Sequence, residues 1–264
     1  MKAQVNGIDV HYELEGPTGA PVITFSHSLA ADLYIWDAQV AQLSDQYRIL
    51  RYDTRGHGGT SASPGLYTME MLVADAVALL DRLDIERTHF VGISMGGMIG
   101  QLLAIHLPHR LDSLVLCDTM SRVPPETGPI WDERVKTAES KGMTALSVPT
   151  LLRWLSSDFR RANPDETERI RNMISKTQVA GYVGCCNAIR NFNVADRLGT
   201  ITVRTLIMVG ENDPVATVSA AKEMKKEIQG AELVVLPEAL HLANVEAADA
   251  CTLALRDFLS KAKL

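Results

Sequence analysis

The residues best suited to chemistry lie in Gly92-Ile93-Ser94-Met95-Gly96, which fits the pattern G-x-S-x-G. The stretch before Ser94 is short and rich in apolar and β-branched residues, and the stretch after it places apolar side chains at helical spacing. This arrangement predicts a sharp turn from a strand into a helix, with Ser94 in a strained conformation and small flanking residues that let neighbouring backbones approach. The pattern therefore predicts that Ser94 is a nucleophile for acyl transfer.

A serine hydroxyl becomes a good nucleophile when a base takes its proton, and histidine is the usual base. Among the seven histidines, His27, His57 and His241 follow predicted strands. Loops at the carboxyl ends of parallel strands open on one face of a sheet, so His57 and His241 compete for this role. His57 precedes Ser94, whereas His241 follows it, as expected in this architecture. We predict that His241 is the base.

An acid must hold the base in the correct tautomer and stabilise its positive charge. Asp118 and Asp213 each end a predicted strand. Asp213 gives the chain order serine, acid, histidine that is expected for a nucleophile of this kind. Each residue also has a structural interpretation, because Asp213 could cap the next helix and His241 could be a polar loop residue. We predict a triad of Ser94, Asp213 and His241, with Asp118 as the alternative acid.

Acyl transfer also needs two backbone amides that stabilise the oxyanion. The residue after the nucleophile, Met95, is predicted to supply one of them. Leu29, in the loop after the predicted strand 22–26, is our prediction for the other, because its amide would face the turn at Ser94 while its side chain lines the pocket. Ser28 is the alternative donor in this loop, and it lacks the flanking glycines of a nucleophile.

The elements that position these residues alternate along the chain. Strands are predicted at 22–26, 47–52, 88–93, 114–117, 205–209 and 232–236, and helices at 68–83, 98–107, 218–228 and 244–261. Alternation of this kind is typical of a largely parallel sheet with crossover helices. A hairpin around Asn6-Gly7 is predicted to precede it. We therefore predict an α/β fold.

Residues 122–199 interrupt the alternation with charge-rich helical patterns and no convincing strand. Such an interruption is best explained as a helical insertion over one end of the sheet. We predict a core domain made of residues 1–121 and 200–264, in which helices flank a mostly parallel sheet. Residues 122–199 are predicted to form a helical lid, or cap.

Composition limits the classes of partner. The 264 residues are 46% hydrophobic, carry a formal net charge of −6 and have a pI near 5.7. Without a basic face or basic run, we expect no nucleic-acid partner and no membrane partner. No secretory leader or bilayer-spanning run is present in the sequence, which predicts a cytoplasmic protein. The four cysteines lack metal-ligand spacing, so we expect reduced thiols and no metal. Oligomeric state is left open.

Several blocks together resemble a known family. They are Ser28-Leu29 with Trp36-Asp37, Arg51-Tyr52-Asp53-Thr54-Arg55-Gly56-His57-Gly58, Gly92-Ile93-Ser94-Met95-Gly96-Gly97, Arg153-Trp154, and Gly181-Tyr182 with Cys185-Cys186. On these blocks the chain resembles the α/β-hydrolase superfamily over nearly its whole length, and within it the bacterial 3-oxoadipate enol-lactonases. The resemblance implies an α/β-hydrolase fold, no cofactor, and hydrolysis of a small enol-lactone that bears a carboxylate, in aromatic catabolism. His27 departs from the lactonase pattern and is common in general esterases.

A carboxylated lactone should need a cationic or donor-rich lid. Arg134, Arg153 and Arg190 are available in the insertion, and each could equally be a solvated surface charge. Trp154, with Trp131 as second choice, is predicted to line the acyl pocket, with core packing of a lid helix as the alternative. A broad carboxylesterase or perhydrolase would use the same triad on linear esters. A ligand receptor on a hydrolase scaffold is a more remote interpretation.

Overall fold

The computed structural model describes residues 1–261, and its sheet has the strand order β1-β2-β4-β3-β5-β6-β7-β8. The strands are β1 (Lys2–Val5), β2 (Ile8–Glu15), β3 (Val22–Ser26), β4 (Arg48–Tyr52), β5 (Thr88–Ile93), β6 (Leu111–Cys117), β7 (Thr205–Gly210) and β8 (Glu232–Leu236). From β4 to β8 the neighbouring strands are parallel, and β2 pairs antiparallel with β1 and β4. The predicted α/β fold with a mostly parallel sheet is confirmed.

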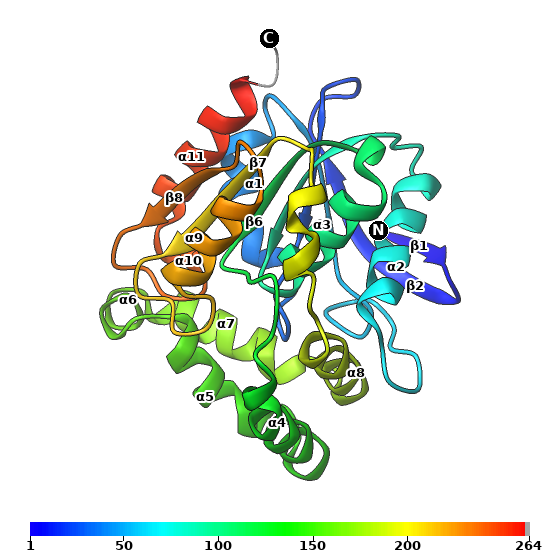
Figure 1. Ribbon diagram of the computed structural model, residues 1–264. Coiled ribbons are helices and arrows are strands. Elements are labelled where there is room, and N and C mark those ends of the chain that lie inside the picture. Colours follow the sequence, from blue (N-terminus) through cyan, green and yellow to red (C-terminus); the bar gives the residue numbers. More distant parts are fainter. Residues whose placement is uncertain (262–264) are drawn as a thin grey trace.

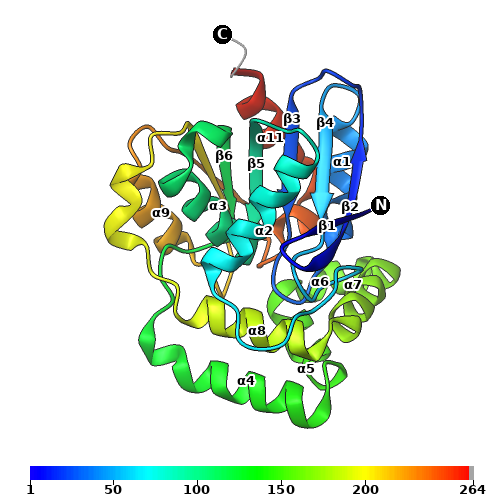
Figure 2. The same ribbon diagram turned by 90° about the vertical axis from the view of Figure 1, so that its right-hand side faces the viewer.

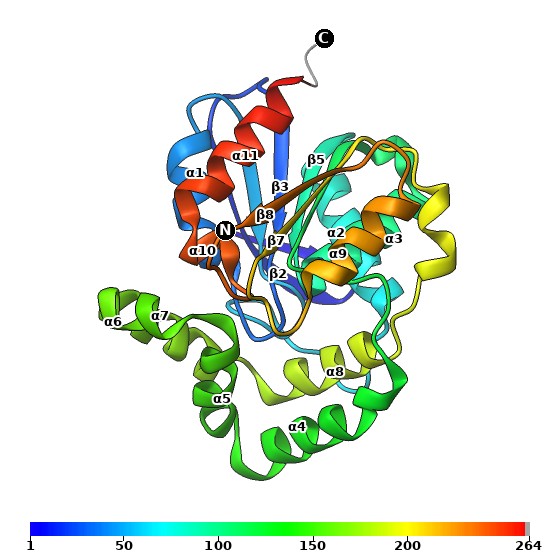
Figure 3. The same ribbon diagram turned by 60° about the vertical axis from the view of Figure 1, so that its left-hand side comes forward.

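Two layers of helices cover the sheet (Figure 3). One face carries α2 (Met69–Arg82), α3 (Met95–His106) and α9 (Val218–Glu227), and the other carries α1 (Asp37–Leu43), α10 (Ala243–Glu246) and α11 (Ala248–Ser260). Helices on both faces bury the central strands, and every residue of β5 and β7 is buried. The sequences of these strands are therefore nearly continuous apolar runs, without the alternation of apolar and polar residues that a half-exposed strand shows.

Local signals explain several elements. Asn6 and Gly7 have φ of 46° and 75°, the left-handed values that a two-residue hairpin turn requires. The Thr68 side chain accepts a hydrogen bond from Met71 N and so caps the start of α2.

Two parts of the structure differ from the predicted pattern. The sequence analysis assigned no element between β3 and β4, where the structure has a 3-10 turn (Leu33–Trp36) and α1. Only seven residues long and without a side-chain cap, α1 is too short to give a clear helical period. The single predicted helix at 244–261 is divided between α10 and α11, because Ala247 leaves the helical region with φ −114° and ψ 47°.

Five helices between β6 and β7 gather at one end of the sheet (Figures 1 and 2). These cap helices are α4 (Gly128–Lys141), α5 (Thr144–Trp154), α6 (Ser157–Ala162), α7 (Pro164–Lys176) and α8 (Val179–Arg190). An isolated bridge between Arg122 and Asn193 ties together the two chain segments that lead into and out of this region. All five helices lie within the insertion predicted at 122–199, and its status as a separate domain stays a prediction.

Contacts between backbones join the cap helices to the core. The closest one brings Gly181 of α8 onto Gly56, in the loop after β4: a Cβ atom added to Gly181 would lie 2.3 Å from Gly56 O. Short 3-10 turns complete the chain at Pro108–Arg110, Pro125–Thr127 and Ala195–Thr200. Within residues 1–261, none of the helices has both the length and the apolar character that crossing a membrane requires.

Candidate active site

Ser94 stands at the junction of β5 and α3, with φ of 53° and ψ of −113°. This is a strained conformation for a residue with a side chain, and close packing around it maintains the turn. A Cβ on Gly92 would lie 2.2 Å from Gly96 O, and one on Gly96 would lie 2.3 Å from Ser26 O. Thr119 Oγ1 donates a hydrogen bond of 2.8 Å to Ser94 O. The two glycines are thus required because the backbones of β3, β5 and α3 approach closely beneath the serine.

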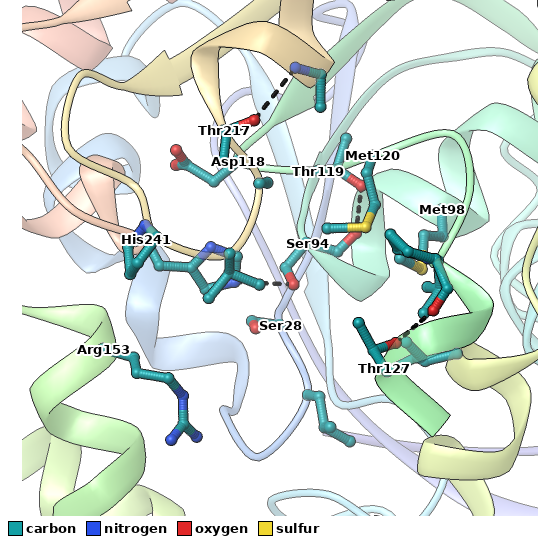
Figure 4. Close-up of a pocket in the computed structure, with 18 of the residues that line it drawn as sticks. Ser28, Ser94, Met98, Asp118, Thr119, Met120, Thr127, Arg153, Thr217 and His241 are labelled. Atoms are coloured by element: carbon teal, nitrogen blue, oxygen red, sulfur yellow. Dashed lines mark hydrogen bonds between the residues drawn. The ribbon is translucent and has the colours of Figure 1, made fainter. Parts of the chain in front are cut away.

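The predicted Ser94, His241 and Asp213 lie in one hydrogen-bonded chain, of which Figure 4 shows the bond between His241 and Ser94. His241 Nε2 is 3.0 Å from Ser94 Oγ, and His241 Nδ1 is 2.9 Å from Asp213 Oδ2. The side chains of His241 and Asp213 are 3% and 0% exposed. An ionised Asp213 accepts from Nδ1–H, which leaves Nε2 as the acceptor for the Ser94 hydroxyl. The arrangement is suited to taking a proton from Ser94.

Backbone amides fix the carboxylate of Asp213. Its Oδ1 atom accepts from Val215 N at 2.7 Å and from Ala216 N at 3.1 Å. The helix that follows, α9, is capped instead by Thr217, whose side chain accepts from Ala220 N. Asp213 therefore closes the turn before α9 and does not cap the helix itself.

The alternative base, His57, and the alternative acid, Asp118, do not take part in the hydrogen-bonded chain of Ser94, His241 and Asp213. His57 donates through Nδ1 to Arg55 O at 3.1 Å, and its buried Nε2 has no partner among the described residues. Burial lowers the pKa of His57 to about 4. Asp118 Oδ1 accepts from Gly210 N at 2.7 Å, and burial followed by the charge of Asp213 raises its pKa well above the usual range. Neither residue hydrogen bonds to Ser94 or His241.

The two predicted oxyanion donors flank the serine from different strands. Met95 is the first residue of α3, and Leu29 follows β3 and lines the cavity at Ser94. Among residues 1–261, no acceptor is hydrogen bonded to the amide of Leu29 or of Met95. Ser28, the alternative donor, lines the same cavity as Ser94 (Figure 4). Leu29 lines the cavity together with Ser94, and Met95 follows Ser94 directly in the chain.

A cavity of about 570 Å³ separates the core loops from the cap helices. Its core wall includes Ser28, Leu29, Ser94, Met98, Met120 and His241, and its cap wall includes Trp131, Arg134, Thr150, Arg153, Trp154 and Tyr182. Both predicted tryptophans line it. The sequence analysis assigned no role to Met98, Met120 or Tyr182. Met98 and Met120 could have been found from their place near the carboxyl ends of β5 and β6.

The three candidate arginines differ in their surroundings. Arg190 is exposed and forms an ion pair of 2.5 Å with Asp132, away from the cavity. Arg134 stacks on Trp131 with its Cζ 4.8 Å from the ring centroid, and Arg153 donates to Thr150 Oγ1 at 3.2 Å. Burial and then the charge of Arg134 lower the pKa of Arg153. Arg134 and Arg153 both line the cavity, and among the described residues neither of the two has a carboxylate partner.

Metal-ligating side chains do not cluster in the described part of the chain. Residues 1–261 contain no group of three or more His, Cys, Asp or Glu side chains that could hold a metal ion. The four cysteines are free and buried, and burial raises the pKa of each thiol. Besides Ser94 and His241, the residues that line the cavity include the arginines Arg122, Arg134 and Arg153, the acids Asp118 and Glu223, and several hydroxyl and aromatic residues.

Comparisons with known proteins agree with this geometry. The sequence profile of the alpha/beta hydrolase fold family matches residues 21–248. The chain is 34% identical to 3-oxoadipate enol-lactonase 2 of Acinetobacter baylyi, over 90% of this chain and 88% of that protein. Its structure is similar to the enol-lactonase from Burkholderia xenovorans LB400, with a TM-score of 0.95, 39% identity, and coverage of 98% of this chain and 100% of the other. A thermophilic esterase from Thermogutta terrifontis, solved with malate bound, has a TM-score of 0.92 and 28% identity, and covers 99% of this chain and 97% of its own.

Proposed function

The chain belongs to the alpha/beta hydrolase family, and we propose that this hydrolase opens a small lactone that bears a carboxylate, through an acyl-enzyme on Ser94. The observation that carries the proposal is the hydrogen-bonded chain from Asp213 through His241 to Ser94, which ends in a cavity whose cap wall carries Arg134 and Arg153. The named lactonases among its relatives support 3-oxoadipate enol-lactone as the substrate.

Acylation would start with attack of Ser94 Oγ on the lactone carbonyl carbon. His241 Nε2 accepts the hydroxyl proton, and Asp213 stabilises the imidazolium that forms. The carbonyl oxygen becomes an oxyanion, which the amides of Leu29 and Met95 would stabilise. When the ring carbon–oxygen bond breaks, His241 returns the proton to the leaving oxygen. Because the substrate is a ring, the leaving group stays attached through the acyl chain.

Deacylation would use the same groups with water in place of the serine hydroxyl. His241 takes a proton from water, the hydroxide attacks the acyl carbon, and the Ser94 oxygen leaves with that proton. The product is a single acid, and an enol in it rearranges to a ketone. No step needs an electron donor or acceptor.

The cavity arginines would select the substrate. Arg134 and Arg153 lie on the cap wall, across the cavity from the core wall at Ser94. A guanidinium without a carboxylate partner is a strong donor for a carboxylate on the substrate. The esterase from Thermogutta terrifontis, which was solved with a dicarboxylate bound, supports this interpretation.

Replacement of Ser94 by alanine tests the nucleophile. We expect S94A to lower kcat by about 10⁵-fold or more, as removal of a triad serine does. The variant should also lose covalent labelling by a fluorophosphonate, measured by intact-protein mass spectrometry. Near-normal hydrolysis by S94A would overturn the proposal.

A broad carboxylesterase or perhydrolase is the second candidate, favoured by the similarity to the esterase from Thermogutta terrifontis. The two candidates differ in substrate preference. We expect kcat/KM for 3-oxoadipate enol-lactone to exceed kcat/KM for short p-nitrophenyl esters. Faster turnover of the linear esters would contradict the lactonase proposal and support the esterase.

A further inference from the structure

His27 lies directly before the loop that carries the Leu29 amide, and its side chain is fully buried. Both of its ring nitrogens are hydrogen bonded to backbone. His27 Nδ1 is 2.7 Å from Ser28 O, and His27 Nε2 accepts a bond of 2.8 Å from Thr54 N. The ring thus links the loop after β3 to the loop after β4.

These two bonds define the tautomer of His27. A backbone N–H can only donate, so Nε2 must present its lone pair to Thr54. A backbone carbonyl can only accept, so Nδ1 must carry the proton that bonds to Ser28 O. The imidazole is therefore neutral with its proton on Nδ1. Burial, followed by the neighbouring His57, lowers the pKa of His27 to about 3, so the ring stays neutral at ordinary pH.

The acceptor of this bond belongs to the same peptide group as the Leu29 amide. In a planar trans peptide, Ser28 C=O and Leu29 N–H point in opposite directions. His27 binds the carbonyl end, and Ala31 N also donates to Ser28 O at 3.1 Å. The amide end therefore points away from the His27 ring, and Leu29 lines the cavity together with Ser94. A hydrogen bond to the carbonyl also polarises the peptide and strengthens its N–H as a donor.

We propose that His27 is a positioning residue of the oxyanion site: its Nδ1–H holds Ser28 C=O so that Leu29 N–H is directed at the oxyanion formed on the carbonyl that Ser94 attacks. The inference rests on the proposed function, because it assumes an oxyanion at this place. It adds a residue that never contacts the substrate and acts through one peptide group.

Two substitutions separate the two hydrogen bonds of His27. An asparagine amide nitrogen is as many bonds from Cα as Nδ1, so His27→Asn can still donate to Ser28 O. A glutamine amide oxygen is as many bonds from Cα as Nε2, so His27→Gln can accept from Thr54 N but leaves Ser28 O without this donor. We expect His27→Gln to lower kcat by about 10²-fold, similar to the loss of one oxyanion donor, with KM within about twofold.

The second measurement is the affinity for an alkyl boronic acid, which forms a tetrahedral adduct with the serine. In His27→Gln the Ki of the boronic acid should rise by about the same factor as kcat falls, because both depend on the oxyanion site. His27→Asn should lose about tenfold less in both quantities. His57→Gln is the matched control: His57 is also a buried histidine, its ring centroid is 5.3 Å from that of His27, and it makes no hydrogen bond to the Ser28 peptide.

Equal losses in His27→Asn and His27→Gln would overturn the inference, because a role in packing alone does not distinguish the two nitrogens. Nitrogen-15 NMR of the unaltered enzyme gives a test that needs no variant: an Nε2–H tautomer of His27 would also overturn it. Fluorophosphonate labelling of the unaltered enzyme and of S94A reports separately on the proposed function. Labelling that depends on Ser94, together with an unchanged boronic acid Ki in His27→Gln, refutes the role of His27 alone.

Discussion

The two walls of the cavity differ in how their polar groups are occupied. On the core wall, both nitrogens of His241 and both oxygens of Asp213 are hydrogen bonded, and the backbone of Ser94 is held by Thr119. On the cap wall, Arg153 has only a bond to the hydroxyl of Thr150. The polar groups of the core wall bond to one another and are held in a fixed geometry, whereas the positive charge of Arg153 on the cap wall has no carboxylate partner among the described residues.

This difference has a physical meaning. Groups that must act on a transition state gain from being held in place before the substrate arrives. A partly buried cation without a carboxylate partner costs stability, so its presence beside a cavity indicates a binding role. We infer that the core wall determines the reaction and the cap wall determines the substrate.

After the loss of Ser94 itself, the largest effect is expected on the core wall, at Asp213. Asp213→Asn should lower kcat by about 10⁴-fold, because asparagine can donate to His241 Nδ1 and favour the wrong tautomer. The KM should change little, since Asp213 does not contact the substrate. Steady-state kinetics with the enol-lactone would measure both.

Asp118→Asn is the matched control, since Asp118 ends the neighbouring strand and is equally buried. Its kcat should stay within about tenfold of the unaltered enzyme, because Asp118 has no bond to His241. A larger loss in Asp118→Asn than in Asp213→Asn would assign the acid to the end of β6 instead.

The next effect is expected on the cap wall, at Arg153. Arg153→Met should lower kcat/KM for a carboxylated lactone by about 10- to 100-fold, the range for a lost hydrogen bond to a charged group. An uncharged p-nitrophenyl ester should lose less than about threefold, because the core wall is unaltered. Arg190→Met, whose arginine pairs with Asp132 outside the cavity, is the control and should affect neither substrate. Equal losses on both substrates would contradict the division between the walls.

The core wall could largely be predicted from the sequence. The G-x-S-x-G pattern is local, and the chain order of Ser94, Asp213 and His241 follows from the order of the strands. In a parallel sheet the loops after consecutive strands meet at one edge, so the topology alone brings distant residues together. His57 and Asp118 also follow parallel strands, and only the chain order of serine, acid and histidine argued against them.

The cap wall could not be predicted to the same degree. Arg134, Arg153 and Arg190 have the same chemistry in the sequence, and only the packing of the cap helices separates the pair at the cavity from the one at the surface. Helical periodicity gives the apolar face of each helix but not the angle at which the helices cross. The role of His27 was missed for a similar reason, because its two partners come from loops that the sequence does not pair.

A smaller effect is expected where the two walls meet, at Gly181. An alanine Cβ there would lie 2.3 Å from Gly56 O, so α8 or the loop after β4 must move. Overpacking of this kind costs about 1–3 kcal/mol, which corresponds to a Tm about 5 °C lower in a protein of this size. Because Tyr182 of α8 lines the cavity, the KM should rise more than kcat falls. Gly128→Ala, at a cap position with nothing within 4 Å, is the control. Equal Tm values for the two variants would show that the junction tolerates movement.

The smallest effect is expected at Asp32, near a second junction where Arg169 of α7 donates to Tyr34 O. Burial, followed by the charge of Asp53, raises the pKa of Asp32 from 3.8 to about 6. The folded protein thus holds this proton more tightly than the unfolded chain, and the free energy of unfolding falls as pH rises from about 4 to about 6.

Asparagine at position 32 keeps an oxygen that can accept from Tyr34 N, as the Asp32 side chain does at 3.0 Å, and it cannot ionise. Asp32→Asn should therefore match the unaltered protein near pH 4 and gain stability as pH rises. A two-unit shift corresponds to at most about 3 kcal/mol, and partial exposure of the side chain reduces this to about 1 kcal/mol at pH 7. Urea unfolding across this pH range measures the difference. A gain that stays constant with pH would show that packing, and not the charge of Asp32, limits stability at this junction.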